Sequence, residues 1–164
     1  MNRIFANRRT PFVFVFAASL GLVLGGVAFS ELMGLGACPL CIIQRMLYLG
    51  LAIVAGVGLF VAGQSLASRL FALAMATVAA TGIFVAGYQV WIQRFAPETN
   101  CSPYPTWWEE MVDRAGEQVP ILFSANGLCS DPAWKFLGLS IADWSLAWFT
   151  LFLLVAVYIA FRQR

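Results

Sequence analysis

Long stretches without a charged residue alternate along the chain with short segments that carry the charges. A helix of about 20 apolar residues is long enough to cross a bilayer, and four stretches reach about that length. They predict four membrane-spanning helices, at residues 12–30, 42–62, 70–91 and 144–161. A spanning β-barrel would instead alternate apolar and polar residues, which the run FVFVF at residues 12–16 does not do. The predicted fold class is an all-α membrane protein built as a four-transmembrane-helix bundle.

Composition supports lipid as the main solvent of this chain. Of its 164 residues, 61% are hydrophobic and only 11% are charged, too few charges for the exterior of an ordinary soluble domain. The net charge is +2 and no basic cluster resembles a nucleic-acid surface, so we expect the lipid bilayer, and no nucleic acid, as a partner. Residues 1–164 are expected to form a single membrane domain.

The basic residues predict the orientation of the spans. They precede the first span, lie between the second and third, and follow the fourth: Arg3, Arg8, Arg9, Arg69, Arg162 and Arg164. Because short cytoplasmic segments are rich in Lys and Arg, both termini are expected in the cytoplasm. The connections at residues 31–41 and 92–143 then face outward, and the longer one is acidic.

All four cysteines fall in the two outward connections. Cys38 and Cys41 form a C-x-x-C motif where the second span begins, and Cys101 and Cys129 lie in the long connection. An outer, oxidising compartment permits disulfides. Four cysteines allow three pairings; adjacency favours Cys38 with Cys41, and a shared connection favours Cys101 with Cys129.

The C-x-x-C motif is predicted to lie at a helix N-terminus. Pro39 suits the first helical turn, so the helix should begin between the two cysteines, where the positive end of the helix dipole favours a thiolate. Arg45 follows Cys41 by four residues and should lie on the same face, one turn away. Its guanidinium could stabilise negative charge there. The alternative is that Arg45 only extends to the lipid headgroups.

The long connection is predicted to carry short interfacial helices. Prolines around Cys101 should keep that segment extended, and Thr106 to Glu109 resemble a capping box that starts a helix. This helix would place one apolar face on the membrane surface, with Trp107, Trp108, Met111, Val112 and Ala115; a solvated charged helix is the alternative. Asn126-Gly127 indicates a turn, and Asp131-Pro132 is expected to begin another short helix.

Three segments together resemble a known family. They are Cys38-Pro39-Leu40-Cys41-Ile42-Ile43-Gln44-Arg45, the long connection with Cys101 and Cys129, and Trp134-Lys135-Phe136-Leu137-Gly138-Leu139 before the fourth span. In this order, with four spans, the chain resembles the disulfide bond formation protein B family (DsbB) over nearly its whole length. The resemblance implies a bacterial inner-membrane, quinone-dependent thiol oxidase with all four cysteines on the periplasmic side.

The resemblance also implies a role for each cysteine. Two redox-active disulfides, Cys38–Cys41 and Cys101–Cys129, would act in series, and a periplasmic DsbA-like thiol oxidase would form a transient mixed disulfide with Cys101. Cys129 would then attack Cys38, leaving Cys41 as a thiolate that reduces ubiquinone or menaquinone from the membrane pool. The net result would be reoxidation of the soluble oxidase.

Two arginines are candidates for the quinone site. The resemblance implies that Arg45 stabilises the Cys41 thiolate and the charge that develops on the quinone. Arg94, at the outer end of the third span, could assist, although contact with lipid headgroups would explain it equally well.

Three other interpretations remain open. The chain could be a structural membrane protein with two static disulfides, although a C-x-x-C at a helix start followed by Arg45 argues against this. A zinc site with four cysteines would need a second short ligand spacing, which Cys101 and Cys129 lack, and the sequence has no histidine, so no metal is expected. The third interpretation is a related thiol-redox enzyme that runs in a different direction or serves a different partner.

Overall fold

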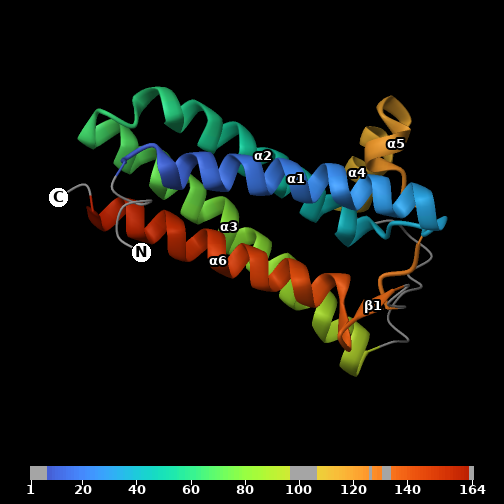
Figure 1. Ribbon diagram of the computed structural model, residues 1–164. Coiled ribbons are helices and arrows are strands. Elements are labelled where there is room, and N and C mark those ends of the chain that lie inside the picture. The colour runs from blue at the N-terminus through green and yellow to red at the C-terminus, as the bar shows by residue number, and fades with distance from the viewer. Residues whose placement is uncertain (1–6, 97–106, 126, 131–133, 163–164) are drawn as a thin grey trace.

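The computed structural model describes residues 7–96, 107–125, 127–130 and 134–162. Four long helices lie lengthwise side by side: α1 (Thr10–Met33), α2 (Pro39–Val61), α3 (Ser65–Phe95) and α6 (Ile141–Arg162) (Figure 1). Each is long and apolar enough to cross a membrane. The predicted all-α bundle of four transmembrane helices is confirmed.

The bundle is held by close packing between neighbouring helices. Helix α3 packs along both α2 and α6, and α1 packs along α2, whereas α1 and α6 make few contacts. At the α3–α6 crossing, a Cβ on Gly82 would overlap the ring of Phe149, so the absent side chain is what lets the two helices approach. The Phe149 ring also stacks on Tyr48 of α2, with ring centroids 4.3 Å apart. Three helices therefore meet around one buried aromatic pair.

The helices extend beyond the apolar stretches that predicted them. Arg69, expected in the connection between the second and third spans, lies inside α3, because that connection is only residues 62–64. Helix α3 also continues past residue 91 to Phe95. Charged side chains marked the ends of the apolar stretches, but backbone hydrogen bonds within a helix do not require apolar side chains, so the helix continues through them.

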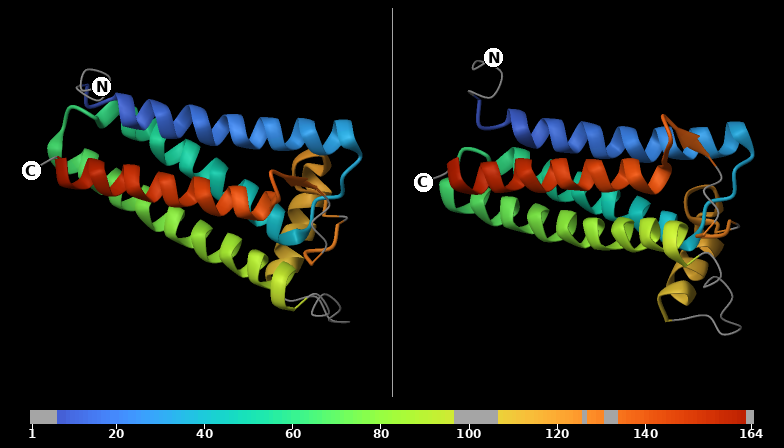
Figure 2. Two further views of the ribbon diagram at one scale, coloured as in Figure 1. Left: turned by 60° about the horizontal axis from the view of Figure 1, so that its bottom comes forward. Right: turned by 90° about the horizontal axis from the view of Figure 1, so that it is seen from below.

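The long connection between α3 and α6 covers one end of the bundle. It contains α4 (Trp107–Gln118), α5 (Pro120–Phe123) and a two-stranded antiparallel hairpin, β1 (Lys135–Phe136) and β2 (Leu139–Ser140). Figures 1 and 2 show these elements together at the end opposite the first turn of α1 and the last turn of α6. We call this the loop end of the bundle.

The hairpin corrects one expectation about this connection. Asp131 and Pro132 lie outside the described residues, but the chain after them forms β1 and β2 where a short helix was expected. Leu137 and Gly138 have φ angles of 55° and 79°, so both central residues of the turn are left-handed, as in a two-residue type I′ hairpin. Leucine rarely adopts this conformation, and the sequence therefore carried no strong hairpin signal here.

Candidate functional site

Cys38 and Cys41 lie together at the first turn of α2. Cys38 is the N-cap residue and Pro39 occupies the first turn, so the helix begins between the two cysteines, as predicted. The Cys38 Sγ lies 3.0 Å from the Cys41 Sγ and accepts a hydrogen bond from the Cys41 backbone N–H at 3.4 Å. A disulfide bond is about 2.05 Å long, so a movement of roughly 1 Å would join the two sulfurs.

The third described cysteine, Cys129, is held against this pair by contacts between the two connections at the loop end. The Gly127 N–H donates to the Ala37 carbonyl oxygen at 3.0 Å, and a Cβ on Gly127 would overlap the Gly36 carbonyl oxygen. Cys129 packs beside Cys38 in a small apolar cluster at this end of α2. Close backbone contact at Gly127, two residues earlier, thus brings Cys129 to Cys38.

Hydrogen bonding divides the protons unequally between Cys38 and Cys129. The pKa of the Cys129 thiol is lowered, chiefly because the Cys38 side chain hydrogen-bonds to it; partial burial opposes this shift and a backbone contact with Leu40 adds to it. The pKa of Cys38 is raised by its hydrogen bonds to Cys129 and Cys41 and by burial, since its side chain is only 3% exposed. In the reduced protein, Cys129 is therefore the better thiolate and Cys38 the hydrogen-bond donor.

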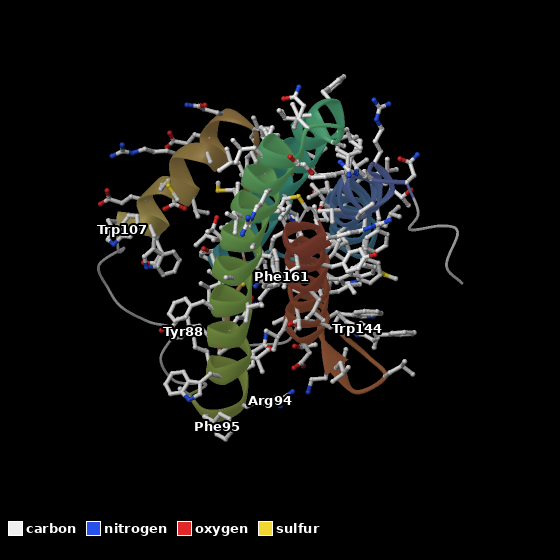
Figure 3. The ribbon with its side chains drawn as sticks, turned by 90° about the vertical axis from the view of Figure 1, so that its left-hand side faces the viewer. Tyr88, Arg94, Phe95, Trp107, Trp144 and Phe161 are labelled. Carbon is white, nitrogen blue, oxygen red and sulfur yellow. The ribbon has the colours of Figure 1, made fainter. Side chains whose placement is uncertain are left out.

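Helix α4 packs against the cysteine end of α2. Its Val112 is fully buried, and Trp108 contacts the cluster that contains Cys38. These contacts hold the long connection beside the C-x-x-C motif. Trp107 is 78% exposed and points away from the bundle (Figure 3), and Met111 is also exposed. The placement of these two side chains on a membrane surface stays a prediction.

Two buried glutamines, which were not among the predicted site residues, complete the surroundings of the sulfurs. The Gln89 Nε2 of α3 lies 3.2 Å from the Cys38 Sγ and 3.2 Å from the Cys41 Sγ. The Gln89 Oε1 accepts a hydrogen bond from the Gln44 Nε2 of α2 at 2.7 Å. The spans were predicted from the absence of charged residues, and an uncharged amide does not end such a stretch. The signal that could have identified these two glutamines was a polar residue inside a predicted span.

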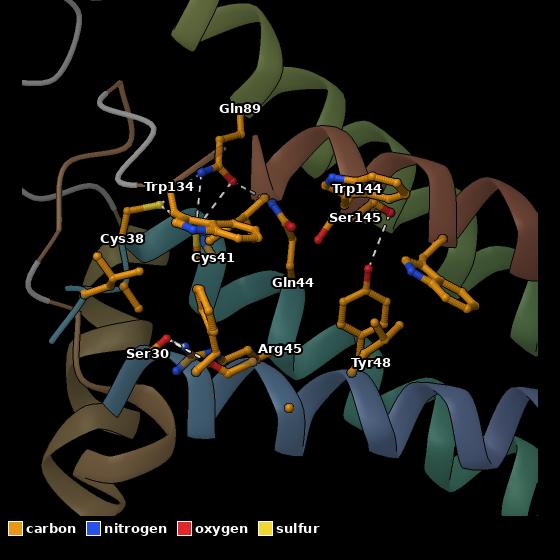
Figure 4. A pocket seen from close by; sticks show the side chains of 18 of the residues that line it. Ser30, Cys38, Cys41, Gln44, Arg45, Tyr48, Gln89, Trp134, Trp144 and Ser145 are labelled. Atoms are coloured by element: carbon orange, nitrogen blue, oxygen red, sulfur yellow. Dashed lines mark hydrogen bonds between the residues drawn. The ribbon is translucent and has the colours of Figure 1, made fainter. Parts of the chain in front are cut away.

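Beside the cysteines lies a cavity of about 460 Å³ that runs between α1, α2 and α6. Most of its lining is apolar, with Phe29 of α1 and three tryptophans, Trp134, Trp144 and Trp148. Cys41, Gln44, Arg45 and Gln89 lie together at the end near Cys38, while Tyr48 and Ser145 line it farther along, beside Trp144 (Figure 4). The cavity suits a flat apolar ring whose polar atoms lie toward the sulfurs.

Trp134 lines this cavity near the loop end. Its ring meets the Phe29 ring edge-on at 4.8 Å and stacks on the Phe136 ring at 5.7 Å. The Trp144 Nε1 donates to the Phe136 carbonyl oxygen at 3.3 Å. The hairpin therefore joins α1 to α6 across the cavity, where the two helices themselves make few contacts.

Arg45 turns into the protein rather than toward headgroups. Its Nη1 donates to the Leu122 carbonyl oxygen of the long connection at 3.1 Å, and its Nη2 donates to the Ser30 Oγ of α1 at 2.8 Å. Arg45 and Cys41 both line the cavity, on the same side of α2 as expected for residues one turn apart. Its action on a thiolate or a bound group stays a prediction.

Arg94 has a different neighbour. Its Nη2 lies 2.6 Å from the Asp143 Oδ1 in an ion pair that joins the end of α3 to the start of α6. Asp143 also accepts hydrogen bonds from the Ser140 N–H and Oγ at 2.9 and 3.0 Å, which caps α6. Assistance to a quinone by Arg94 therefore stays a prediction, while its visible contact is structural.

The remaining predicted site residue, Cys101, lies outside the described residues, and so does the Pro-rich segment around it. Its pairing with Cys129 stays a prediction. Within the described part of the chain, no group of three or more His, Cys, Asp or Glu side chains is arranged to hold a metal ion.

Comparison with known proteins gives one consistent result. A family model described as "Disulfide bond formation protein DsbB" matches residues 8–159. The chain is 38% identical to disulfide bond formation protein B of Dechloromonas aromatica over 148 residues, 88% of this chain and 87% of the relative. It is 35% identical to the protein of that name from Aromatoleum aromaticum over 160 residues, 96% and 95% of the two chains. A third relative, from Nitrosomonas eutropha, is 34% identical over 160 residues, 90% and 91% of the two chains.

Proposed function

The chain belongs to the DsbB family of disulfide bond formation proteins, and from this premise we propose that it reoxidises a periplasmic DsbA-like thiol oxidase and passes the electrons to membrane quinone. Membership makes it a multi-pass membrane protein that acts in disulfide formation. The soluble partner, the quinone and the path between them are the proposal.

One observation carries the proposed path. The Cys129 side chain contacts Cys38, and the partner of Cys38 at 3.0 Å, Cys41, faces the apolar cavity. An electron pair that arrives at Cys129 could therefore reach the cavity through sulfur atoms already in contact. Static disulfides would need no third sulfur in this position.

The proposed exchange between the pairs is balanced in atoms and electrons. One thiolate of the soluble oxidase attacks Cys101 of a Cys101–Cys129 disulfide; a mixed disulfide with Cys101 forms, the Cys101–Cys129 bond breaks and Cys129 leaves as a thiolate, and the second thiol of the oxidase can later displace Cys101. The Cys129 thiolate then attacks the Cys38 sulfur; the Cys38–Cys41 bond breaks, a Cys38–Cys129 bond forms, and the electron pair of the broken bond remains on Cys41. The thiolate, rather than the thiol, is the nucleophile in this step, and Cys129 leaves the first disulfide in that form.

The residues around the cavity fit a quinone. Ubiquinone or menaquinone would supply a lipid-soluble acceptor for two electrons and two protons. The tryptophans and Phe29 offer flat apolar surfaces, while Arg45 and Gln44 offer N–H donors at the end where Cys41 lies. No metal is needed for this chemistry, because the electron pair moves between sulfurs and leaves at Cys41.

The distribution of charge supports the proposed orientation. Arg9 precedes α1, Arg69 lies in the second turn of α3 and Arg162 ends α6, all at the end of the bundle away from the cysteines. Acidic residues of α4 lie at the loop end. Because cytoplasmic flanks are enriched in basic residues, the loop end would face the periplasm and both termini the cytoplasm of the bacterial inner membrane.

The direct test uses the full chain purified in detergent, with a reduced DsbA-like dithiol protein and ubiquinone or menaquinone, and follows quinone reduction. We expect catalytic turnover with the wild type and none with Cys101→Ser, because the proposed attack of the soluble partner needs that sulfur. A wild-type protein whose cysteines resist a thiol trap under mild reduction, and which shows no turnover, would refute the oxidase and favour static disulfides.

A second variant tests the role of Arg45. Arg45→Ala removes a positively charged side chain from the cavity lining, and because a hydrogen bond to a charged group contributes about 1.5–3 kcal/mol, we expect the KM for quinone to rise about tenfold or more. Arg114→Ala is the matched control, since Arg114 is 79% exposed on α4 and pairs only loosely, at 3.8 Å, with Glu110. Equal KM values in the two variants would contradict the assignment.

A further inference from the structure

Gln89 is the polar side chain in closest contact with both sulfurs of the C-x-x-C motif. Its amide nitrogen lies 3.2 Å from the Cys38 Sγ and 3.2 Å from the Cys41 Sγ, so the two N–H groups of one amide can each meet one sulfur (Figure 4). The side chain is only 2% exposed and projects from the last two turns of α3 into the bundle, where an amide without a polar partner would be costly. Its position opposite the sulfurs therefore needs a chemical explanation.

The chemistry of the sulfurs determines which way this amide faces. A disulfide sulfur or a thiolate carries no hydrogen, so the group facing it must be a donor, and the amide nitrogen is the only donor of Gln89. The oxygen then points away and requires a donor of its own, which the Gln44 Nε2 supplies at 2.7 Å. The Cys41 Sγ is 3.8 Å from the Gln89 Oε1, farther than from the nitrogen. Gln44, only 3% exposed, thus holds the Gln89 amide with its N–H groups toward the sulfurs.

The nearest charged donor is engaged elsewhere. The two terminal nitrogens of Arg45 donate to the Leu122 carbonyl oxygen and to the Ser30 Oγ. Arg45 can act on Cys41 through its charge, but among the described residues the side-chain N–H group within hydrogen-bond distance of the Cys41 sulfur is that of Gln89. The Gln89 amide is therefore the side-chain group that can stabilise an anion on the Cys41 sulfur by direct contact.

We propose that Gln89 is a catalytic residue of the exchange, donating hydrogen bonds to the Cys41 and Cys38 sulfurs, and that Gln44 is the positioning residue that orients it. This inference rests on the proposed function. When the Cys129 thiolate attacks Cys38, the Cys38–Cys41 bond breaks and Cys41 leaves with the electron pair. The Gln89 N–H stabilises this leaving thiolate without giving up its proton, so no proton changes place in the step.

A purely structural role would be to join α2 to α3 through the Gln44–Gln89 hydrogen bond. Removal of such a joint would lower the stability of the fold but would not change the equilibrium between the disulfide and the dithiol at Cys38 and Cys41. Loss of a donor to a thiolate would shift that equilibrium toward the disulfide. The reduction potential therefore separates the two roles.

The experiment uses the full-length Cys101→Ser/Cys129→Ser protein in detergent, in which Cys38 and Cys41 are the remaining cysteines. The protein is equilibrated with glutathione buffers without quinone, trapped with an alkylating reagent and analysed by mass. We expect Gln89→Met, which keeps the length of the side chain but has no N–H, to favour the disulfide about tenfold, a potential about 30 mV lower. Gln89→Leu should shift it in the same direction, and Gln44→Met by less.

Thr81→Val is the matched control on the same helix. Its exposed hydroxyl donates to the Thr77 carbonyl oxygen of α3 itself, away from the cysteines, so the equilibrium should stay as in the parent. Gln89→Met and Gln89→Leu within twofold of the parent would overturn the role of Gln89 while the proposed function stands. A parent whose Cys38 and Cys41 do not exchange with glutathione at all would overturn both.

Discussion

Replacement of Gly127 by alanine should move Cys129 away from Cys38 without changing any cysteine. The added Cβ would lie 2.9 Å from the Gly36 carbonyl carbon and 3.2 Å from the Ala37 carbonyl carbon, and closer still to the Gly36 carbonyl oxygen. Because carbon atoms pack best at about 3.5–4.0 Å, the segment must retreat by roughly 0.6–1.1 Å. The same movement weakens the hydrogen bond from the Gly127 N–H to Ala37 and draws Cys129 away from Cys38.

A displacement of this size is large for a reacting atom. Attack requires the two sulfurs near contact distance, and a misplacement of about 1 Å can cost about 100-fold in rate. We therefore expect Gly127→Ala to slow formation of the Cys38–Cys129 disulfide by about that factor. The closest contacts of Gly127 are with Gly36 and Ala37, in the connection before α2, so the bundle should unfold at the wild-type temperature.

The assay isolates this one bond. In a Cys41→Ser/Cys101→Ser background only Cys38 and Cys129 remain, so a mild oxidant can form just one intramolecular disulfide, and its rate is measured by alkylation at timed intervals and mass analysis. Gly87→Ala is the matched control, because a Cβ at Gly87 would meet nothing within 4 Å. Formation of the disulfide at the same rate with and without Gly127→Ala would refute the reasoning from backbone contact.

Two further predictions concern reactivity and packing. In the fully reduced protein, the lowered pKa of Cys129 means that its thiolate forms at lower pH than that of an ordinary cysteine, so the pH–rate profile of its alkylation should have a low midpoint. Cys38→Ala removes the hydrogen bond to Cys129 and should move that midpoint to higher pH. An unchanged midpoint would contradict the hydrogen bond as the cause. Gly82→Ala should overpack α3 against Phe149 and destabilise the bundle by about 1–3 kcal/mol in thermal unfolding in detergent, whereas Gly87→Ala should not.

The spans and the start of α2 could be predicted because their signals are local. A run of apolar residues long enough to cross a bilayer specifies a helix, since every backbone group in lipid must be paired within its own segment. Pro39 after Cys38 likewise identifies the first turn of α2 from two adjacent residues. The start of α3 was predicted too late in the sequence because Arg69 ends the apolar stretch. The helix itself begins before Arg69, at Ser65.

The long connection was harder to predict because its conformation depends on contacts with other segments. The hairpin at Leu137–Gly138 uses a leucine with positive φ, and aromatic contacts of Trp134 and Phe136 with Phe29 and Trp144 hold it in place. None of these partners is adjacent in sequence. A local reading of Asp131-Pro132 therefore favoured a helix, and tertiary packing produced a hairpin.

By itself, the sequence determined that the chain crosses a membrane four times and that it carries one C-x-x-C motif at the start of a span and two further cysteines in the long connection. Which groups meet at those sulfurs was decided only in the tertiary structure. Cys129 reaches Cys38 through a backbone contact at Gly127, and Gln89 reaches both sulfurs from a different helix. Such contacts depend on how helices and connections pack at one end of a bundle, and residues 48 to 51 positions apart leave no local pattern that pairs them.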